Sequence, residues 1–156
     1  MNIVSLLHTE NVIPNLEAED KIEVLNKLVD SLQSQVGAEE LEAIREAVLE
    51  REKIMSTGVG KGLAIPHGKA EGIDDNYAAF AILKDQIDYE AVDGQPVKLV
   101  FMLVGPQSSN SLHIKMLSKI SRLMNNTDFR NRLTSCTTAD EIIGVFEEEE
   151  KAHFGG

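Results

Sequence analysis

One histidine in this sequence, His67, is flanked by residues that would present its imidazole as a nucleophile. It follows a glycine-rich segment at residues 56–65 and stands between Pro66 and Gly68. Proline fixes its own φ angle and restricts the residue before it, so the backbone that leads to the histidine is stiff. Gly68 places no side chain beside the imidazole. We therefore expect His67 at a rigid strand end, open to a reactant; the commoner alternative is a surface histidine after a flexible turn.

The glycines that precede this histidine do not form a nucleotide-binding motif. A dinucleotide fingerprint would need glycine where the sequence has Leu63, and a P-loop would need serine or threonine after Lys61. If residues 58–64 form one extended strand, the glycines share a face and indicate close approach of a helix backbone or a partner molecule. The other face is then expected to pack into the core through Thr57, Val59, Leu63 and Ile65.

A second histidine, His113, is predicted to lie in the first turn of a helix. It precedes the apolar residues of one helix face, Met116, Leu117, Ile120 and Met124, at helical spacing. It also follows the carboxyl end of a predicted central strand, where open α/β sheets usually place their ligands. The first turn of a helix favours anions through its dipole and its free N–H groups. The alternative is a hydrogen-bonded core histidine.

An arginine, Arg51, continues the apolar stripe of another predicted helix, formed by Ile44 and Val48. Charged side chains are rarely buried without a partner, so Arg51 is predicted to face an anion or a carboxylate inside the fold. The alternative is a favourable charge at the helix C-terminus, with the aliphatic stem packed on the core.

Together, His67, His113 and Arg51 suit phosphoryl transfer. An imidazole has an ordinary pKa of ~6.5, so its neutral form is abundant near pH 7 and can accept the group without a separate base. The reaction also needs positive charge around the migrating oxygens, which Arg51 and His113 could supply. A metal site on the two histidines would lack the carboxylate or thiolate ligands of common coordination sets. We therefore expect neither a metal nor another cofactor.

Length and composition indicate one domain over residues 1–156, with an ordered core at about residues 3–150. The 26 acidic and 15 basic residues give a net charge of −11, which disfavours nucleic acid and favours a docking partner with a basic face. Cys136 is the single cysteine, so no internal disulfide can form and a reducing cytoplasm is expected. The longest apolar run, residues 99–104, is too short to insert into a membrane.

Periodicity predicts an alternation of helices and strands. Apolar runs predict strands at 77–83 and 97–104, with a short one at 87–89; the run at 97–104 is typical of a central strand covered on both faces. Helical spacing predicts helices at 22–36, ended by Gly37, and at 39–52, 112–124, 128–134 and 139–149. The fold class is therefore α/β.

In these motifs the chain resembles the enzyme IIA domains of the bacterial phosphoenolpyruvate-dependent phosphotransferase system, of the fructose, mannitol and nitrogen-regulatory type. The resemblance covers nearly the whole chain and rests on Arg51-Glu52, Ser56-Thr-Gly58, Gly60, Gly62, Ala64-Ile-Pro-His67, Asp93-Gly-Gln-Pro96 and the helix that begins at Leu112. It implies a mixed five-stranded sheet flanked by helices on both faces. It also implies that His67 is the phosphorylated residue, with His113 and Arg51 as further active-site residues.

The resemblance further implies a phosphotransferase component that takes its phosphoryl group from the carrier HPr or the nitrogen-branch counterpart of HPr. In sugar-transport members the group passes on to a cysteine of a IIB domain; we expect no such segment here, and Cys136 lacks a comparable signature. The sequences of the motifs Ser-Thr-Gly-Val-Gly and Ile-Pro-His-Gly-Lys are closer to those of the nitrogen-regulatory branch. Two hypotheses stay open: a carrier that serves a IIB partner, and a regulatory module that binds a kinase or transporter according to the phosphorylation of His67.

Overall fold

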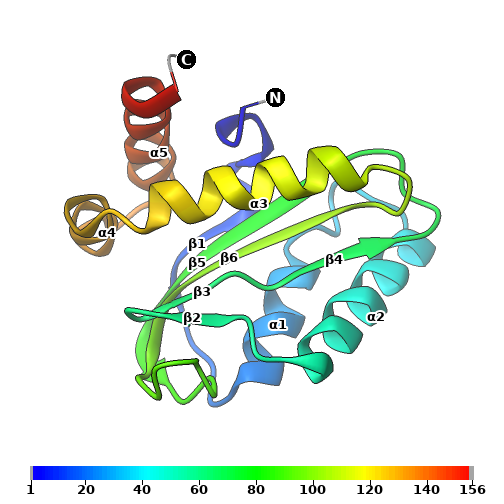
Figure 1. Cartoon of the computed structure of the whole chain (residues 1–156), viewed down its shortest axis with the longest axis horizontal. Coiled ribbons are helices and arrows are strands. Elements are labelled where there is room, and N and C mark those ends of the chain that lie inside the picture. Colours follow the sequence, from blue (N-terminus) through cyan, green and yellow to red (C-terminus); the bar gives the residue numbers. More distant parts are fainter. Residues whose placement is uncertain (1, 155–156) are drawn as a thin grey trace.

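A mixed β-sheet runs through the middle of the molecule (Figure 1). The computed structural model describes residues 2–154. The strands lie in the order β1-β5-β6-β3-β2, and β4 also pairs with β6. β1 is parallel to β5, whereas β3 and β4 are parallel to β6; the other pairs are antiparallel. Because β3 and β4 both pair with β6 and share one position, the six strands occupy five positions, and the expected mixed sheet is confirmed. The strands are β1 (Val12–Leu16), β2 (Gly58–Gly60), β3 (Leu63–Ala64), β4 (His67–Ala70), β5 (Tyr77–Ile87) and β6 (Val97–Pro106).

Helices cover both faces of this sheet, as expected. On one face lie α1 (Lys21–Asp30) and α2 (Ala38–Ile54). On the other lie α3 (Asn110–Met124), α4 (Thr127–Thr134) and α5 (Ala139–Phe154), with the short 3-10 turn Val4–Leu6; a second such turn, Thr9–Asn11, leads into β1. The predicted central strand is confirmed in β6, where Phe101 packs into one core and Val100 into the other. A strand buried on both faces needs such a continuous apolar run.

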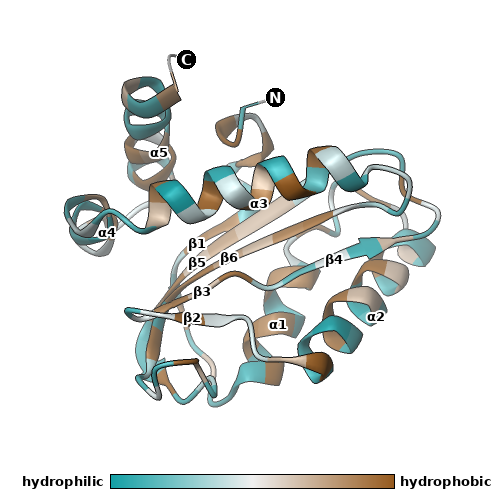
Figure 2. Ribbon diagram, viewed as in Figure 1, coloured by the Kyte–Doolittle hydropathy of each residue, from teal (hydrophilic) through white to brown (hydrophobic). Residues whose placement is uncertain are grey.

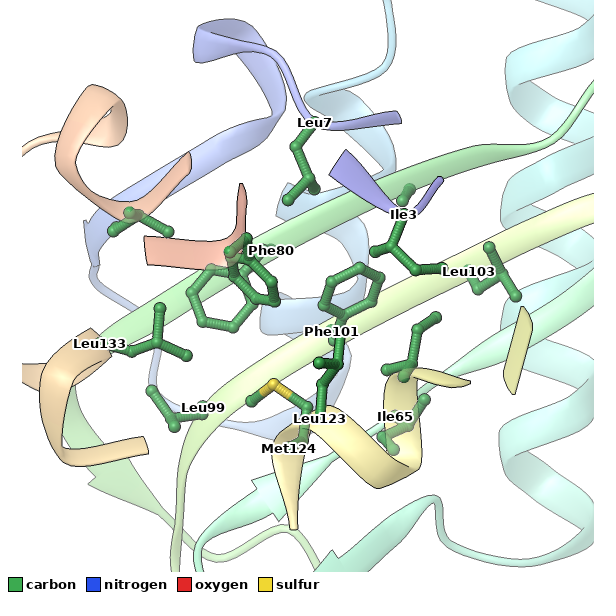
Figure 3. Close-up of a cluster of buried hydrophobic side chains, with 14 of the residues drawn as sticks. Ile3, Leu7, Ile65, Phe80, Leu99, Phe101, Leu103, Leu123, Met124 and Leu133 are labelled. Atoms are coloured by element: carbon green, nitrogen blue, oxygen red, sulfur yellow. The ribbon is translucent and has the colours of Figure 1, made fainter. Parts of the chain in front are cut away.

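Two apolar cores result, one on each side of the sheet. Figure 2 shows hydrophobic residues along β5 and β6 and hydrophilic residues on the outer turns of the helices. Figure 3 shows part of the core under α3, α4 and α5, where the side chains of Phe80 and Phe101 lie among aliphatic residues. The ring of Phe146 meets the rings of Phe80 and Phe129 edge to face, each at a centroid distance of 5.1 Å.

Glu150 of α5 joins the first described residues to the rest of the fold. Its carboxylate is almost fully buried and accepts the backbone N–H groups of Ile3 at 2.7 Å and Val4 at 3.0 Å. It also forms an ion pair with Lys119 of α3 at 2.8 Å. One carboxylate therefore links the amino-terminal segment, α3 and α5.

Outside the glycine-rich segment, the secondary structure differs from the predictions at three main places. Strand β1 was not predicted. The helix expected at 22–36 ends at Asp30, and Gly37 is the N-cap residue of α2 instead of the stop of the preceding helix. The short strand expected at 87–89 does not form, because Ile87 completes β5 and Tyr89 is buried outside any strand.

The glycine-rich segment forms a tight hairpin, so the prediction of one extended strand over 58–64 is wrong. Gly60, Lys61 and Gly62 have φ values of 102°, 60° and 77°, which reverse the chain between β2 and β3. Val59 is consequently exposed, although it was expected in the core. The close approach inferred from the glycines does occur at Gly58, where an added Cβ would lie 2.8 Å from the Cα of Ala91. The neighbour there is a loop and not a helix.

Candidate functional site

His67 lies at an interruption within one strand position of the sheet. β3 pairs with β6 through Ala64 and Val100, and β4 continues the same register through His67 and Leu103. Pro66 has no N–H to add to the ladder, but its carbonyl accepts the N–H of Leu103 at 3.0 Å. His67 is therefore the first residue of β4, and the prediction of a strand end is corrected.

The imidazole of His67 is held by its own backbone. Its Nδ1 lies 2.9 Å from the carbonyl oxygen of Ile65. A carbonyl can only accept, so Nδ1 carries the proton and Nε2 keeps its lone pair. The ring is half-buried at the edge of the sheet. This arrangement fixes both the tautomer and the direction of the nucleophilic nitrogen.

The second predicted histidine, His113, lies directly beside the first. It is in the first turn of α3, as predicted, and its side chain is 5% exposed. The centroids of the two rings are 5.9 Å apart, and the ring planes are tilted by 52°. His113 Nδ1 is buried without a hydrogen-bond partner. The alternative of a core histidine with a satisfied hydrogen bond therefore does not hold at this nitrogen.

Arg51 belongs to the same site but not in the way that the helix pattern predicted. The residue that continues the buried stripe of α2 is Glu52, one position further along. Arg51 is half-buried at the edge, where its guanidinium donates to the carbonyl of Met55 at 2.9 Å. Its side chain lines the same groove as His67 and His113. The arginine is therefore close to the histidines while keeping part of its surface open.

Glu52 belongs to the Arg51-Glu52 motif, but no role was assigned to it from the sequence. Its buried carboxylate accepts the backbone N–H of Thr57 at 2.8 Å, the hydroxyl of Thr57 at 2.5 Å and the hydroxyl of Tyr89 at 3.3 Å. Lys21 of α1 forms an ion pair with it at 3.4 Å. This network anchors the end of α2, and hence Arg51, to the hairpin that leads to His67.

An open groove with a volume of about 680 Å³ brings these residues together. Its basic lining includes Lys69, which contacts Asn110 at the start of α3. Two isoleucines, Ile54 and Ile114, also line it and are 80% and 65% exposed. The groove thus combines imidazole and cationic groups with an apolar rim, and it is large enough for a side chain presented by another protein. Neither the two isoleucines nor Asn110 had been singled out from the sequence.

The surroundings keep both histidines neutral. Burial is the main cause that lowers the pKa of His67, and the positive charge of Arg51 lowers it further, against the hydrogen bond to Ile65 and the negative charge of Glu52. Burial also lowers the pKa of His113 to about 4, with smaller contributions from His67 and Lys69. Near pH 7 the imidazole of His67 is therefore in its nucleophilic form.

Within residues 2–154, no group of three or more histidine, cysteine, aspartate or glutamate side chains is arranged to hold a metal ion. Cys136 is partly buried against the core under α4 and α5, far along the chain from the groove residues. Across the same described part of the chain, every helix is too short or too polar to cross a lipid bilayer.

Comparison with known proteins agrees with this fold and groove. Residues 5–149 match the family model described as "Phosphoenolpyruvate-dependent sugar phosphotransferase system, EIIA 2". The chain therefore belongs to this family of phosphotransferase components, and the resemblance found in its motifs is confirmed.

Among its relatives, a nitrogen regulatory protein of Bradyrhizobium diazoefficiens is 37% identical over 145 residues, which are 93% of this chain and 94% of that protein. The "PTS system fructose-specific EIIABC component" of Bacillus subtilis is 35% identical over 151 residues, or 97% of this chain, but only 24% of that longer protein is matched. The crystal structure of the nitrogen regulatory protein IIA-Ntr from Neisseria meningitidis superimposes with a TM-score of 0.83 at 27% identity, covering 92% of this chain and 98% of that one.

Proposed function

We propose that this chain is a phosphohistidine carrier, in which Nε2 of His67 accepts a phosphoryl group from the phosphohistidine of HPr or its nitrogen-branch counterpart. The observation that carries the proposal is the hydrogen bond between His67 Nδ1 and the Ile65 carbonyl. It leaves the lone pair of Nε2 free beside Arg51 and His113, in a groove that a second protein can enter.

In the transfer, the lone pair of His67 Nε2 forms the new P–N bond while the P–N bond of the donor histidine breaks. The electron pair of the broken bond stays with the donor imidazole. Nδ1 of His67 keeps its proton, which it donates to the carbonyl of Ile65 in a hydrogen bond. Arg51 and an Nε2–H of His113 stabilise the phosphoryl oxygens. Because little covalent chemistry is required beyond this exchange, positioning and positive charge supply most of the catalysis.

We place the carrier in the nitrogen-regulatory branch. The motif wording around His67 and the names of several relatives support this choice. Transport of fructose or mannitol, with His67 donating to the cysteine of a IIB domain, is the competing assignment and is supported by the fructose-specific relative.

A mass-spectrometric assay tests the proposal. The protein is incubated with phosphoenolpyruvate, enzyme I and HPr from each branch, and wild type is compared with His67→Ala. We expect an acid-labile gain of one phosphate that the variant does not show, with the nitrogen-branch donor the faster. Unchanged labelling of His67→Ala would move the acceptor elsewhere, and preference for the sugar-branch donor would favour the transport assignment.

A second candidate function is that of a regulatory module that binds a kinase or transporter according to the state of His67. The exposed side chains of Ile54 and Ile114 beside the histidines favour it, because such a rim suits protein docking. A phosphoryl group adds nearly two negative charges between these side chains and would change which partner binds. A target whose affinity differs between phosphorylated and unphosphorylated protein, without loss of the phosphate, would support this function.

A further inference from the structure

Two buried polar atoms next to the groove lack hydrogen-bond partners. They are Oδ1 of Asn76, which lies between β4 and β5, and Nδ1 of His113. Asn76 is 4% exposed, so its amide oxygen has little access to water. A buried polar atom without a partner costs free energy and is rare in folded proteins. Two such atoms near one site indicate a hydrogen bond that forms in another state of the protein.

The position of Gly105 shows that the two atoms are neighbours. A Cβ added to Gly105 of β6 would lie 2.4 Å from Oδ1 of Asn76 and 3.4 Å from Nδ1 of His113. Both atoms thus lie over the same backbone residue, in space that any other residue would fill with its side chain.

The protonation of His113 explains why the pair is unbonded in this state. When His113 is neutral with its proton on Nε2, Nδ1 presents a lone pair to the lone pairs of Oδ1, and two acceptors cannot bond. His113 Nε2 is not among the buried unpartnered atoms of residues 2–154, and no hydrogen bond occupies it, so it reaches the groove. A second proton, on Nδ1, would convert the mismatch into a donor and an acceptor.

We propose that Asn76 is a positioning residue for His113 in the phosphorylated protein. When His67 carries the phosphoryl group, His113 takes a proton from solvent and becomes an imidazolium. Its Nδ1–H then donates to Oδ1 of Asn76, and its Nε2–H points to a phosphoryl oxygen. This inference rests on the proposed function of His67.

The charges around His113 fit this change. The charged and titratable groups that face it are His67 and Lys69 of β4 and Glu50 and Arg51 of α2. In the unphosphorylated protein, burial and the cationic neighbours lower the pKa of His113 to about 4, so it is neutral. Nearly two negative charges on His67, whose ring centroid is 5.9 Å away, raise that pKa. An acceptor at Asn76 favours the charged ring further.

The experiment follows the His113 imidazole by ¹⁵N NMR, as a function of pH, in proteins phosphorylated with phosphoenolpyruvate, enzyme I and HPr. Compared with phosphorylated wild type, we expect the pKa of His113 to be lower in phosphorylated Asn76→Ala and higher in phosphorylated Asn76→Asp. The return of the phosphoryl group to HPr should be about tenfold slower in Asn76→Ala, the loss of one charge-assisted hydrogen bond. An unchanged or raised pKa of His113 in Asn76→Ala would overturn the proposal, since the amide would then face His113 with its NH₂ or not at all.

Two further variants separate this role from a general effect on folding. Gly105→Ala places a methyl group against Oδ1 of Asn76 and should lower the pKa of His113 in the same direction while Asn76 is retained. Asn11→Ala removes another buried asparagine, which is not among the groove residues. The side-chain amide of Asn11 donates to the carbonyl of Leu6 at 3.1 Å. Asn11→Ala should lower the melting temperature without changing the His113 titration. Absence of phosphate on wild type would overturn both this inference and the proposed function, whereas labelled proteins with identical titrations would overturn only the role of Asn76.

Discussion

The backbone of Gly68 lies directly against the backbone of Ala47. A Cβ added to Gly68 would lie 3.1 Å from the carbonyl carbon of Ala47 and 3.2 Å from its oxygen. Helix α2 therefore packs on β4 at a distance that only glycine permits, and Arg51 follows Ala47 by four residues, one turn along the same face of the helix. The glycine next to His67 was expected to leave room for a reactant; its neighbour in the structure is the helix that carries the arginine.

Substitution of this glycine should move the arginine. In Gly68→Ala, the methyl group meets helix backbone, so α2 must shift by a few tenths of an ångström, and we expect a loss of about 1–3 kcal/mol in the free energy of unfolding. Displacement of Arg51 should also shorten the lifetime of the phosphorylated form. Denaturant unfolding and loss of phosphate measured by mass spectrometry check both effects.

Gly144 of α5 is the matched control, because a Cβ there meets nothing within 4 Å. Gly144→Ala should stabilise the protein by about 0.5–1 kcal/mol, since alanine suits a helix interior better than glycine. Equal stability of Gly68→Ala and wild type would show that the contact with Ala47 relaxes freely.

Removal of the second histidine should slow transfer without abolishing acceptance. His113→Ala keeps the nucleophile and its hydrogen bond to Ile65 but removes one donor to the phosphoryl oxygens. We expect the rate of phosphoryl exchange with HPr to fall about 10²-fold, with His67 still labelled at long times. Quench-flow measurement of labelling supplies the rate; wild-type rates in both directions would exclude His113 from the mechanism.

Loss of the anchoring carboxylate should destabilise the protein. Glu52→Ala leaves Thr57, Tyr89 and Lys21 without their shared partner, and breaking a buried ion pair in this way costs about 3–5 kcal/mol. Glu50→Ala is the control two residues earlier, because its ion pair with Lys53 is exposed on both sides and contributes about 0–1 kcal/mol. Urea unfolding compares the two variants, and similar midpoints would mean that the network around Glu52 adds little.

The stability of the protein should depend on the titration of His113. In the folded protein the pKa of His113 is about 4, whereas in an unfolded chain the pKa of a histidine is ~6.5, so between these pH values the unfolded state binds more protons. The titration of His113 therefore does not reduce the free energy of unfolding above pH ~6.5, but it reduces this free energy progressively as the pH is lowered toward 4. We expect wild type to lose about 2 kcal/mol relative to His113→Gln over this range. Parallel stability profiles of the two proteins would contradict the lowered pKa.

The sequence predicted well those elements whose pattern is repeated over many residues. α3 and β6 were found because the apolar spacing of the one and the continuous apolar run of the other persist along the whole element. The position of His113 followed from that spacing. β1 was missed because Pro14 and Asn15 lie within it, and proline disfavours a strand unless it lies at the edge of a sheet, as β1 does.

The site was predicted less completely, because its geometry depends on contacts between distant residues. Successive residues of an α-helix are rotated by about 100° around its axis. The apolar spacing alone could therefore not tell whether Arg51 or Glu52 is buried. Glu52 is the buried residue because its carboxylate accepts a hydrogen bond from Tyr89, which is 37 residues away in the sequence. The facing atoms of Asn76 and His113 likewise meet over Gly105 only when β6 and α3 are in place. A signal for the hairpin was present in the alternating glycines, but an extended strand explained them equally well.

The contacts of the Glu150 carboxylate with Ile3, Val4 and Lys119 also bear on how this fold can be attached to other polypeptides. This carboxylate joins the first described residues and α5 (Figure 1) to Lys119 in the carboxyl-terminal half of α3, whereas His113 lies in the first turn of that helix. A polypeptide joined next to the segment at Ile3 or next to Glu150 would therefore start from the part of α3 that lies away from His113. Under the proposed function, such an attachment would leave the groove around His67 open to a visiting protein.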